Sequence, residues 1–540
     1  MKRKYSLLTF LLALFATASI AQSSIGVQYY YMGEYDAAKI YFEKQLGSNP
    51  AEANFYLGEI AYAQGKFDDA KGFYAKGLAA NPEYIKNKIG EAKVTLKTNA
   101  KAADDILTSI LKNKAYRKNA EVLIAVARAY YEGGVKDKAL SSIELARKGN
   151  SKFYGIYILE GDMQAKASAG EAAGKYEQAI HFAPKEALGY LKSAKIYETI
   201  RPTFAIEKLN TVLGFDSNNV LAYKYLGEIN TSTGRFNDAI VAYERFFSMA
   251  QYKTPDDIAR YSSVLYFLER YDDALALITE GLAQDAEHYV LNRFYLYCLI
   301  SVKDFEKAVV VAEKFFSIQT DRERIAKDYS SYATALKETK QFEKALEQYN
   351  KAIEVDKSSA LNIYAEIADL YRNAGESGKA AEAYKGYIEA RGENVEARDY
   401  YQLGSYYYQA GTVIDSSKVD VTMIDQIKAD FLAKADEAFS VVIERLPDSF
   451  TGYLWRARTQ ASLDPETTEG LAKPYYEKLI EVLLSKGEPS NSMLIESYKY
   501  MGYYYYLKEE KENSIGYWEK ILEISPSDPT AIMVLGELRK

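Results

Sequence analysis

Few residues in this sequence have the types and spacing that catalysis requires. The 540 residues include only two histidines, His181 and His288, and neither has a cysteine or a second histidine nearby. A zinc site or a serine–histidine–aspartate arrangement needs several such groups, so both histidines are interpreted as surface or boundary residues. Cys298, the only cysteine, lies in the apolar stretch FYLYCLIS and is predicted to be a buried helix residue.

Adjacent acidic residues recur along the chain and could be read as metal ligands or glycosidase carboxylates. They are Asp68-Asp69, Asp104-Asp105, Asp256-Asp257 and Asp272-Asp273. Their recurrence at the start of predicted helices instead favours an interaction with the helix dipole. No G-x-x-x-x-G-K-[ST] or G-x-G-x-x-G motif is present to hold phosphate. We therefore predict no catalytic residue, no metal and no cofactor; an enzyme would need a catalytic group within residues 412–429.

The elements that position side chains in this chain are helix pairs, and residues 51–83 show the pattern best. They read AEANFYLGEIAYAQGKFDDAKGFYAKGLAANPE, with two amphipathic segments on either side of Gly65 and a stop at Pro82. Small residues at Gly58 and Ala70 would let two antiparallel helices approach closely, with Tyr74 filling the space beside them. Pro82 lacks the N–H that a continuing helix needs.

The small residue that opens each second helix marks how often this unit recurs. We place it at Ala38, Ala70, Ala102, Ala139, Ala172, Ala205, Ala239, Ala274, Ala308, Ala345, Ala380, Ala435, Ala472 and Ser514. Most intervals between these markers are 32 to 37 residues, which predicts about fourteen repeats. The interval from Ala380 to Ala435 is 55 residues, so we expect an insertion there.

The spacing of Leu57-Gly58, Gly65, Phe67, Ala70, Tyr74, Gly77 and Pro82 resembles the tetratricopeptide repeat (TPR), a helix–turn–helix unit of about 34 residues. The resemblance covers nearly all of the chain after residue 21. It implies an all-α, right-handed TPR superhelix, or α-solenoid, of about fourteen helix pairs with a C-terminal capping helix. The segment from Trp455 to Glu481 also resembles a unit of exported TPR proteins from Gram-negative cell envelopes. Each repeat is expected to pack only on its neighbours, so that stability is close to additive.

The first residues read as a signal peptide, with Lys2, Arg3 and Lys4 before an apolar run and cleavage between Ala21 and Gln22. Removing these three cations takes the formal charge from −7 to −10, which disfavours nucleic acid as a partner. The expected organisation is residues 1–21 signal peptide, 22–411 TPR array, 412–429 insertion, 430–528 C-terminal repeats and 529–540 capping helix. No apolar run suits an integral membrane span, and we expect export, most readily to a Gram-negative periplasm, with the extracellular space as the alternative.

A helix-pair solenoid presents its first helices on the concave side, and the TPR resemblance implies that partners bind there. Positions 2, 5, 9 and 12 of each unit share one stripe of the first helix, and six of the fourteen residues at position 12 are tyrosine. The residues predicted to line this groove are Tyr62, Tyr131, Tyr266, Lys337, Arg372, Tyr401, Tyr408, Tyr503 and Tyr506. These tyrosines could anchor a peptide or helix, or they could only pack between repeats. Phe55/Glu59 and Lys224/Glu228 at positions 5 and 9 lack the Lys/Asn pattern of chaperone-binding TPRs.

The function predicted from these observations is a non-catalytic protein–protein interaction scaffold or adaptor of the cell envelope. Its partners would be other envelope proteins that place a peptide or helix in the concave groove. The alternative is a carbohydrate-binding accessory protein in which exposed tyrosines stack on sugar rings.

Overall fold

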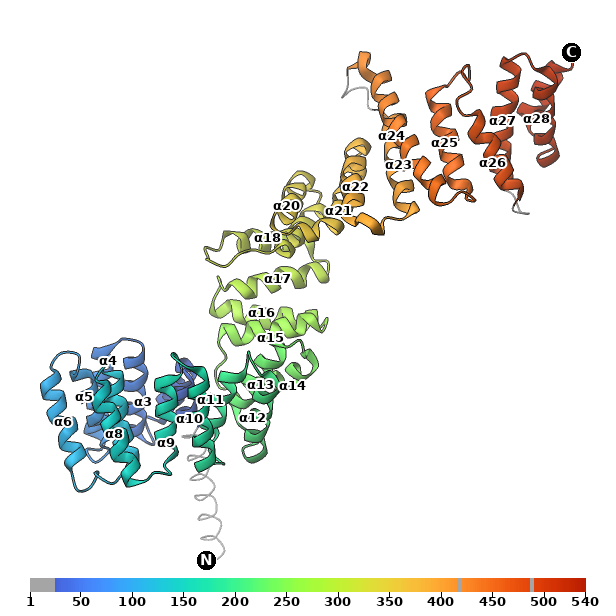
Figure 1. Ribbon diagram of the computed structural model, residues 1–540. Helices are drawn as coiled ribbons and strands as arrows, with labels where there is room; N and C mark the ends of the chain where they lie inside the picture. Colours follow the sequence, from blue (N-terminus) through green and yellow to red (C-terminus); the bar gives the residue numbers. More distant parts are fainter. Residues whose placement is uncertain (1–24, 415–419, 486–489) are drawn as a thin grey trace, which may run out of the picture. The chain divides into compact units, whose positions relative to one another are not determined.

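The computed structural model describes residues 25–414, 420–485 and 490–540. The predicted signal peptide and its cleavage site at Ala21 and Gln22 lie outside these described residues. The chain divides into two compact units, Met1–Cys298 and Leu299–Lys540, and the division falls within helix α17 (Figure 1). Each unit is described below by itself.

Unit 1 begins, in its described part, with helical residues 25–32. The helices that follow are α2 (Tyr35–Gln45), α3 (Pro50–Ala63), α4 (Phe67–Ala80), α5 (Lys86–Thr95), α6 (Ala100–Lys112), α7 (Ala120–Glu132), α8 (Lys136–Gly149), α9 (Tyr154–Gln164), α10 (Ala169–Phe182), α11 (Ala187–Tyr197), α12 (Pro202–Phe215), α13 (Val220–Ser232), α14 (Phe236–Met249), α15 (Pro255–Phe267), α16 (Tyr271–Gln284) and α17 (Tyr289–Ser301).

Unit 2 continues with the same kind of element. Its helices are α18 (Phe305–Ser317), α19 (Ala326–Glu338), α20 (Phe342–Val355), α21 (Ala360–Asn373), α22 (Ser377–Arg391), α23 (Ala397–Thr412), α24 (Ile424–Arg445), α25 (Phe450–Leu463), α26 (Lys473–Ser485), α27 (Asn491–Leu507), α28 (Lys511–Ile524) and α29 (Pro529–Leu538). Short 3₁₀ turns occupy Lys357–Ser359, Gly392–Asn394 and Val421–Met423.

Within the described ranges the chain is all-α, and in each unit successive helices pack as helix pairs, with α29 following the last pair. The predicted fold class, an α-solenoid of helix pairs with a terminal helix, is confirmed. The turn between paired helices follows from residue type: Gly65 has φ +76°, a left-handed conformation that ends α3 and lets α4 start at Phe67.

The small residues that mark each second helix are fully buried in the structure. Ala70 and the other marker residues are 0% exposed, with one exception in the third repeat. There the buried residue is Ala103, whereas Ala102 is only partly buried, so the predicted register of this repeat is wrong by one residue. The aromatic residue that precedes the alanine in the clearest repeats, such as Phe67 before Ala70, is missing here, which removed one signal that sets the register.

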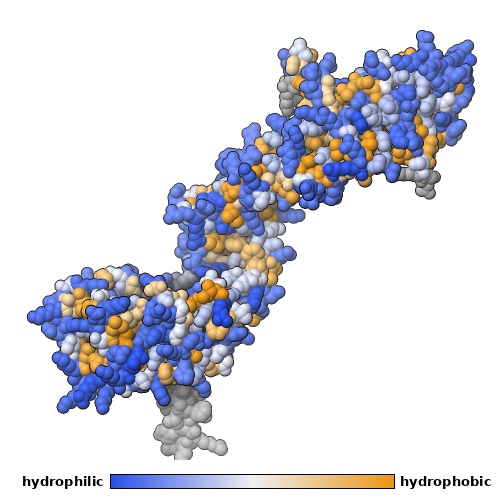
Figure 2. Space-filling model, viewed as in Figure 1, coloured by the Kyte–Doolittle hydropathy of each residue, from blue (hydrophilic) through white to orange (hydrophobic). Residues whose placement is uncertain are grey.

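The long interval in unit 2 lies between α23, which ends at Thr412, and α24, which begins at Ile424. Helix α24 has 22 residues, whereas second helices elsewhere have mostly 13 or 14. Residues at this end expose apolar side chains, namely Val413, Val421 and Met423. Figure 2 shows apolar colour at the projecting end of α24, within a surface that is mostly hydrophilic.

The core of unit 1 departs from nearest-neighbour packing. One continuous hydrophobic cluster joins residues 29–74 of the first two repeats with residues 187–264 of the later repeats. Tyr29 and Tyr41 from the first hairpin belong to the same cluster as Val220 and Ala250. The first hairpin, residues 25–45, therefore packs on repeats far along the chain, and the expectation that each repeat contacts only its neighbours is wrong for unit 1.

Candidate partner-binding surfaces

First helices of successive repeats in unit 1 pack on one another, as α3 does on α5, α5 on α7, α7 on α9, and α13 on α15. A row of charged residues runs along this inner layer at intervals of 33 to 35 residues. The row consists of Glu59, Lys93, Arg128, Asp162, Lys195 and Glu228. Consecutive members mostly form ion pairs between repeats, which ties the inner layer together.

The best-buried part of this row is centred on Lys93, whose side chain is 2% exposed. Its ammonium group donates to Glu59 and to Glu132, each at 2.8 Å. Tyr74 and Tyr30 donate hydroxyl hydrogen bonds to the two oxygens of Glu59, at 2.6 and 2.9 Å. Burial alone would raise the pKa of Glu59, but Lys93 and these hydrogen bonds together hold it below its usual value.

A second centre lies at Asp162 on α9. Arg128 and Lys192 form ion pairs with it at 2.9 and 2.8 Å, and Tyr176 donates a hydrogen bond at 3.0 Å. Burial opposes ionisation of Asp162, yet Lys192 and Arg128 outweigh it and lower its pKa. The guanidinium of Arg128 also stacks on the ring of Tyr31, 4.9 Å from its centroid.

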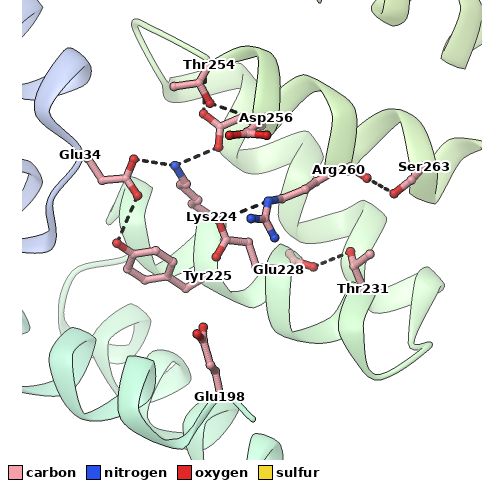
Figure 3. Close-up of polar contacts among 12 residues, drawn as sticks. Glu34, Glu198, Lys224, Tyr225, Glu228, Thr231, Thr254, Asp256, Arg260 and Ser263 are labelled. Atoms are coloured by element: carbon pink, nitrogen blue, oxygen red, sulfur yellow. Dashed lines mark hydrogen bonds and ion pairs between the residues drawn. The ribbon is translucent and has the colours of Figure 1, made fainter. Parts of the chain in front are cut away.

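A third centre fastens the first hairpin to α13. Glu34 accepts a hydrogen bond from the ammonium of Lys224 at 2.7 Å and one from the Tyr225 hydroxyl at 3.3 Å (Figure 3). Lys224 also pairs with Asp257 at 2.9 Å. Although burial opposes the charged form of Lys224, the carboxylates of Asp257 and Glu34 raise its pKa. All three centres combine buried charges with partners from different repeats.

The predicted groove residues of unit 1 are engaged in contacts between helices. Tyr62 is 8% exposed and donates its hydroxyl hydrogen to the backbone oxygen of Glu132 at 3.2 Å. The hydroxyl of Tyr131 lies 3.5 Å from the backbone oxygen of Met163. The ring of Tyr266 packs against several aromatic rings, including that of Phe294 at 5.5 Å. None of these three is grouped with another predicted residue, and their binding role stays a prediction.

Unit 2 brings two predicted tyrosines together. Tyr401 and Tyr408 lie on α23, and their ring centroids are 6.0 and 5.3 Å from that of Trp455 on α25. The ring of Trp455 stacks at 5.7 Å on Phe439, which is fully buried. The guanidinium of Arg458 lies 5.1 Å from the Trp455 ring. We call Tyr401, Tyr408 and Trp455 the aromatic cluster of unit 2.

The remaining predicted residues of unit 2 lie on other first helices. Lys337 on α19 pairs with Glu366 at 2.6 Å, and Arg372 on α21 pairs with Asp369 at 3.1 Å. Tyr503 and Tyr506 on α27 are 42% and 50% exposed. Their exposure leaves these two rings accessible to a ligand, whereas Lys337 and Arg372 already have acidic partners.

Two sets of inner-layer residues were not found from the sequence. Trp455 was not placed in the groove because it does not stand at one of the four stripe positions of its repeat. The groove prediction rested mainly on position 12 of each repeat and did not include the charged row, although charges recur at the repeat interval from Glu59 to Glu228 in the sequence.

Cys298, His181 and His288 lie in separate parts of the described structure. Cys298 is 0% exposed, which confirms its predicted burial, and that burial raises the pKa of its thiol to about 12. His181 is exposed, and the Nε2 atom of His288 lies 3.1 Å from the Oδ1 atom of Asp256. Over the described ranges, no group of three or more histidine, cysteine, aspartate or glutamate side chains is placed to hold a metal ion. Nor does any described helix have the length and apolarity to cross a membrane.

Comparisons with known proteins agree with this architecture. A family model described as "Tetratricopeptide repeat" matches residues 25–85 and 333–395. The TPR repeat-containing protein MJ1428 of Methanocaldococcus jannaschii is 23% identical over 445 residues, which cover 77% of this chain and 72% of that protein.

Similar solved structures include the C-terminal part of a TPR repeat-containing protein from Cytophaga hutchinsonii, 29% identical with a TM-score of 0.36. The match covers 51% of this chain and 98% of that one. Another is YrrB, described as a TPR protein with an unusual peptide-binding site, 19% identical with a TM-score of 0.31 over 34% of this chain and 94% of that one. The helix pairs, the buried marker residues and the family-model matches over residues 25–85 and 333–395 show that the chain contains tetratricopeptide repeats.

Proposed function

We propose that this protein is a non-catalytic scaffold of the cell envelope that holds a peptide or helix of another envelope protein on the first helices of unit 2. A TPR fold in itself indicates a role in protein–protein interaction. The observation that supports this particular site is the aromatic cluster of unit 2, formed by Tyr401, Tyr408 and Trp455.

The aromatic cluster has the properties of an interaction anchor. Its three rings are partly buried, and Trp455 stacks on the fully buried Phe439. Because these side chains are already restrained in the free protein, they lose little conformational entropy on binding. Beside it Arg458 forms two hydrogen bonds to Glu496, at 2.9 and 2.7 Å, which gives the apolar surface a polar edge. An apolar centre with a polar rim is typical of protein-binding sites.

The surface is extended by α27, where Tyr503 and Tyr506 stand three residues apart and therefore on one face of the helix. Both rings are about half exposed. A peptide that crosses α23, α25 and α27 would meet five aromatic side chains on successive first helices, which suits an extended segment or a helix with regularly spaced apolar residues.

Photo-crosslinking in intact cells tests this proposal. A photoreactive phenylalanine at Tyr408 or Tyr506 is expected to capture a partner protein. The same group at Val310, an exposed residue of the second helix α18, serves as the matched control and is expected to capture little. Equal or stronger capture at Val310 would contradict binding on the first helices. Saturable binding on a glycan array that is lost in Tyr408→Ala and Tyr506→Ala would instead support the carbohydrate alternative.

Export to the envelope is part of the same proposal and is supported by the basic residues and apolar run of residues 1–21. Mass spectrometry of the protein isolated from cells is expected to find a mature chain that begins at Gln22. A chain that retains residues 1–21 in the cytoplasmic fraction would contradict export.

A further inference from the structure

A cavity of about 410 Å³ lies inside unit 1, bordered by inner-layer helices. Its wall combines charged side chains with apolar and aromatic ones, the latter contributed by Phe55, Ile89, Ile124, Phe153, Ile158 and Leu188. This volume and this kind of lining are within the range typical of preformed small-molecule sites. The cavity is unrelated to the aromatic cluster of unit 2, so it needs a separate explanation.

The first hairpin forms one side of the cavity, through Val27 and Tyr31. Three polar contacts fasten this hairpin to helices far along the chain. Asn219 donates to the side-chain oxygen of Gln28 at 2.9 Å, Lys192 donates to the backbone oxygen of Tyr31 at 2.9 Å, and Glu34 pairs with Lys224 at 2.7 Å. Because the hairpin supplies part of the wall, the cavity is complete only while these contacts hold the hairpin in place.

The cations that line the cavity already have anionic partners. Lys86 pairs with Glu121 at 2.6 Å, Lys93 with Glu59 at 2.8 Å, and Arg128 with Asp162 at 2.9 Å. A charged ligand would lose its hydration on entry and would have to break one of these pairs to find a counter-charge. The lining therefore favours an uncharged ligand.

Hydroxyl groups offer the ligand its hydrogen bonds. Tyr56 lines the cavity and is only 3% exposed, yet its hydroxyl makes no hydrogen bond within the described parts of the chain. The hydroxyls of Tyr31 and Tyr154, which also line the cavity, likewise make none to described residues. These three hydroxyls are not among the buried side-chain atoms that lack a partner, because they face the cavity; a group in the cavity that can donate or accept a hydrogen bond would therefore find them accessible.

We propose that this cavity is a binding site for an uncharged, mainly apolar organic group that carries a hydrogen-bonding function, and that the first hairpin closes the site around it. The group can belong to a free small molecule or to a bulky side chain of a peptide, since both present the same chemistry. Ligand binding and docking of the hairpin are then linked, because each requires the other for full strength.

The test uses the full-length mature chain and N-phenyl-1-naphthylamine, an uncharged aromatic amine that becomes fluorescent in apolar sites. We expect saturable binding of one probe per chain. Ala125→Leu, which extends a side chain into the cavity from α7, is expected to weaken binding at least tenfold. Tyr56→Phe keeps the ring and removes only the hydroxyl, and it is expected to weaken binding several-fold. Circular dichroism confirms that each variant is folded.

One further variant tests whether the first hairpin closes the cavity, and a second is a control for probe binding at other surfaces. Lys224→Met removes a contact of the hairpin without touching the cavity wall and is expected to weaken probe binding several-fold. Gly72→Ala, on the exposed side of α4, is the control and should leave the probe affinity unchanged. Absence of saturable binding, or probe affinity unchanged in Ala125→Leu and Tyr56→Phe, overturns the site; unchanged affinity in Lys224→Met overturns the closure. Competition by acetyl-Ala-Trp-Ala-amide assigns the natural ligand to peptides, and its failure assigns it to small molecules.

Discussion

At the scale of single residues, unit 1 is unusual in how completely it buries ionised groups. Lys93 and Glu59 have side chains that are 2% and 5% exposed. Both remain charged because they pair with each other, while Lys93 also pairs with Glu132 and Glu59 also accepts hydrogen bonds from the hydroxyls of Tyr74 and Tyr30. Such a group adds little net stability compared with an apolar core, but removing one member leaves a buried charge without compensation. The contribution of each residue therefore depends on the presence of the others.

Replacing Lys93 by methionine is expected to lower the free energy of unfolding by about 3–5 kcal/mol, because Glu59 and Glu132 lose their shared cation. Urea denaturation followed by circular dichroism measures this. The control is Lys39→Met, whose pair with Glu43 is 3.9 Å long and about half exposed; its removal is expected to change stability by no more than about 0.5 kcal/mol. Similar effects of the two substitutions would show that the buried cluster has no special energetic role.

Acid is expected to destabilise the protein through Glu59 and Asp162. Their folded-state pKa values are lowered, so the stability they contribute is fully present above the unfolded pKa of about 4 and is lost as the pH falls through the folded value. In Glu59→Gln, unfolding free energy measured below about pH 5 should fall less steeply than in the wild type. Parallel curves for the two proteins would contradict this assignment.

At the scale of the helix pair, close approach depends on a glycine in the first helix opposite an aromatic ring of the second. A side chain at Gly58 would come within 2.5 Å of the Tyr74 ring, so only glycine fits there. The same relation recurs along the chain, between Gly26 and Tyr41, Gly161 and Tyr176, Gly227 and Tyr243, Gly404 and Phe439, and Gly502 and Trp518. In each of these helix pairs the glycine and the facing ring fix how closely the two helices approach.

Gly58→Ala is expected to destabilise the protein by about 1–3 kcal/mol, because the added methyl group displaces the Tyr74 ring in a packed core. Gly72→Ala, in the second helix of the same repeat, has open space around it and is expected to stabilise by about 0.5–1 kcal/mol through helix propensity. Thermal unfolding of the two variants should show shifts of opposite sign. A gain in stability for Gly58→Ala would refute the close-approach argument.

At the scale of the whole molecule, unit 1 does not behave as a simple row of repeats. Contacts of its first hairpin span 161 residues to Lys192, 190 to Lys224 and 207 between Lys44 and Gln251. In a linear solenoid each repeat contacts its neighbours, and the units open almost independently. Long-range closure instead couples the first hairpin to α11 and α13, so these segments are expected to open together.

Amide hydrogen exchange measures this coupling. In Lys224→Met, exchange is expected to become faster both in residues 25–45 and in α13, because the contact with Glu34 is lost from both sides. Lys195→Met is the control, since Lys195 pairs only with Glu198 and Glu228 among the described residues; its effect should remain in the repeats that contain those residues. Faster exchange limited to α13 in Lys224→Met would show that the hairpin is held independently of this contact.

The fold was largely predictable from the sequence, while the sites were less so. The repeat interval, the turn at Gly65 and the close approach of Gly58 and Tyr74 all depend on residues within one helix pair, where spacing predicts contact. The third repeat was misplaced by one residue where the aromatic marker is absent. Tyr401 and Tyr408 contact Trp455 because α23 packs on α25. The pattern of residues within one repeat does not predict which side chains of the next repeat they meet.

The sequence by itself determined that this chain is a series of helix pairs, because the small marker residue of each second helix recurs at nearly regular intervals and the contacts that hold a pair join residues close in sequence. Only the tertiary structure decided that Glu34 meets Lys224 and that Val27 and Tyr31 complete a cavity. Small rotations between successive repeats add up over seven helix pairs before the first hairpin meets its partners. The sequence pattern of a single repeat does not predict the total rotation, so the contact of the first hairpin with later repeats and the cavity it borders could be found only in the tertiary structure.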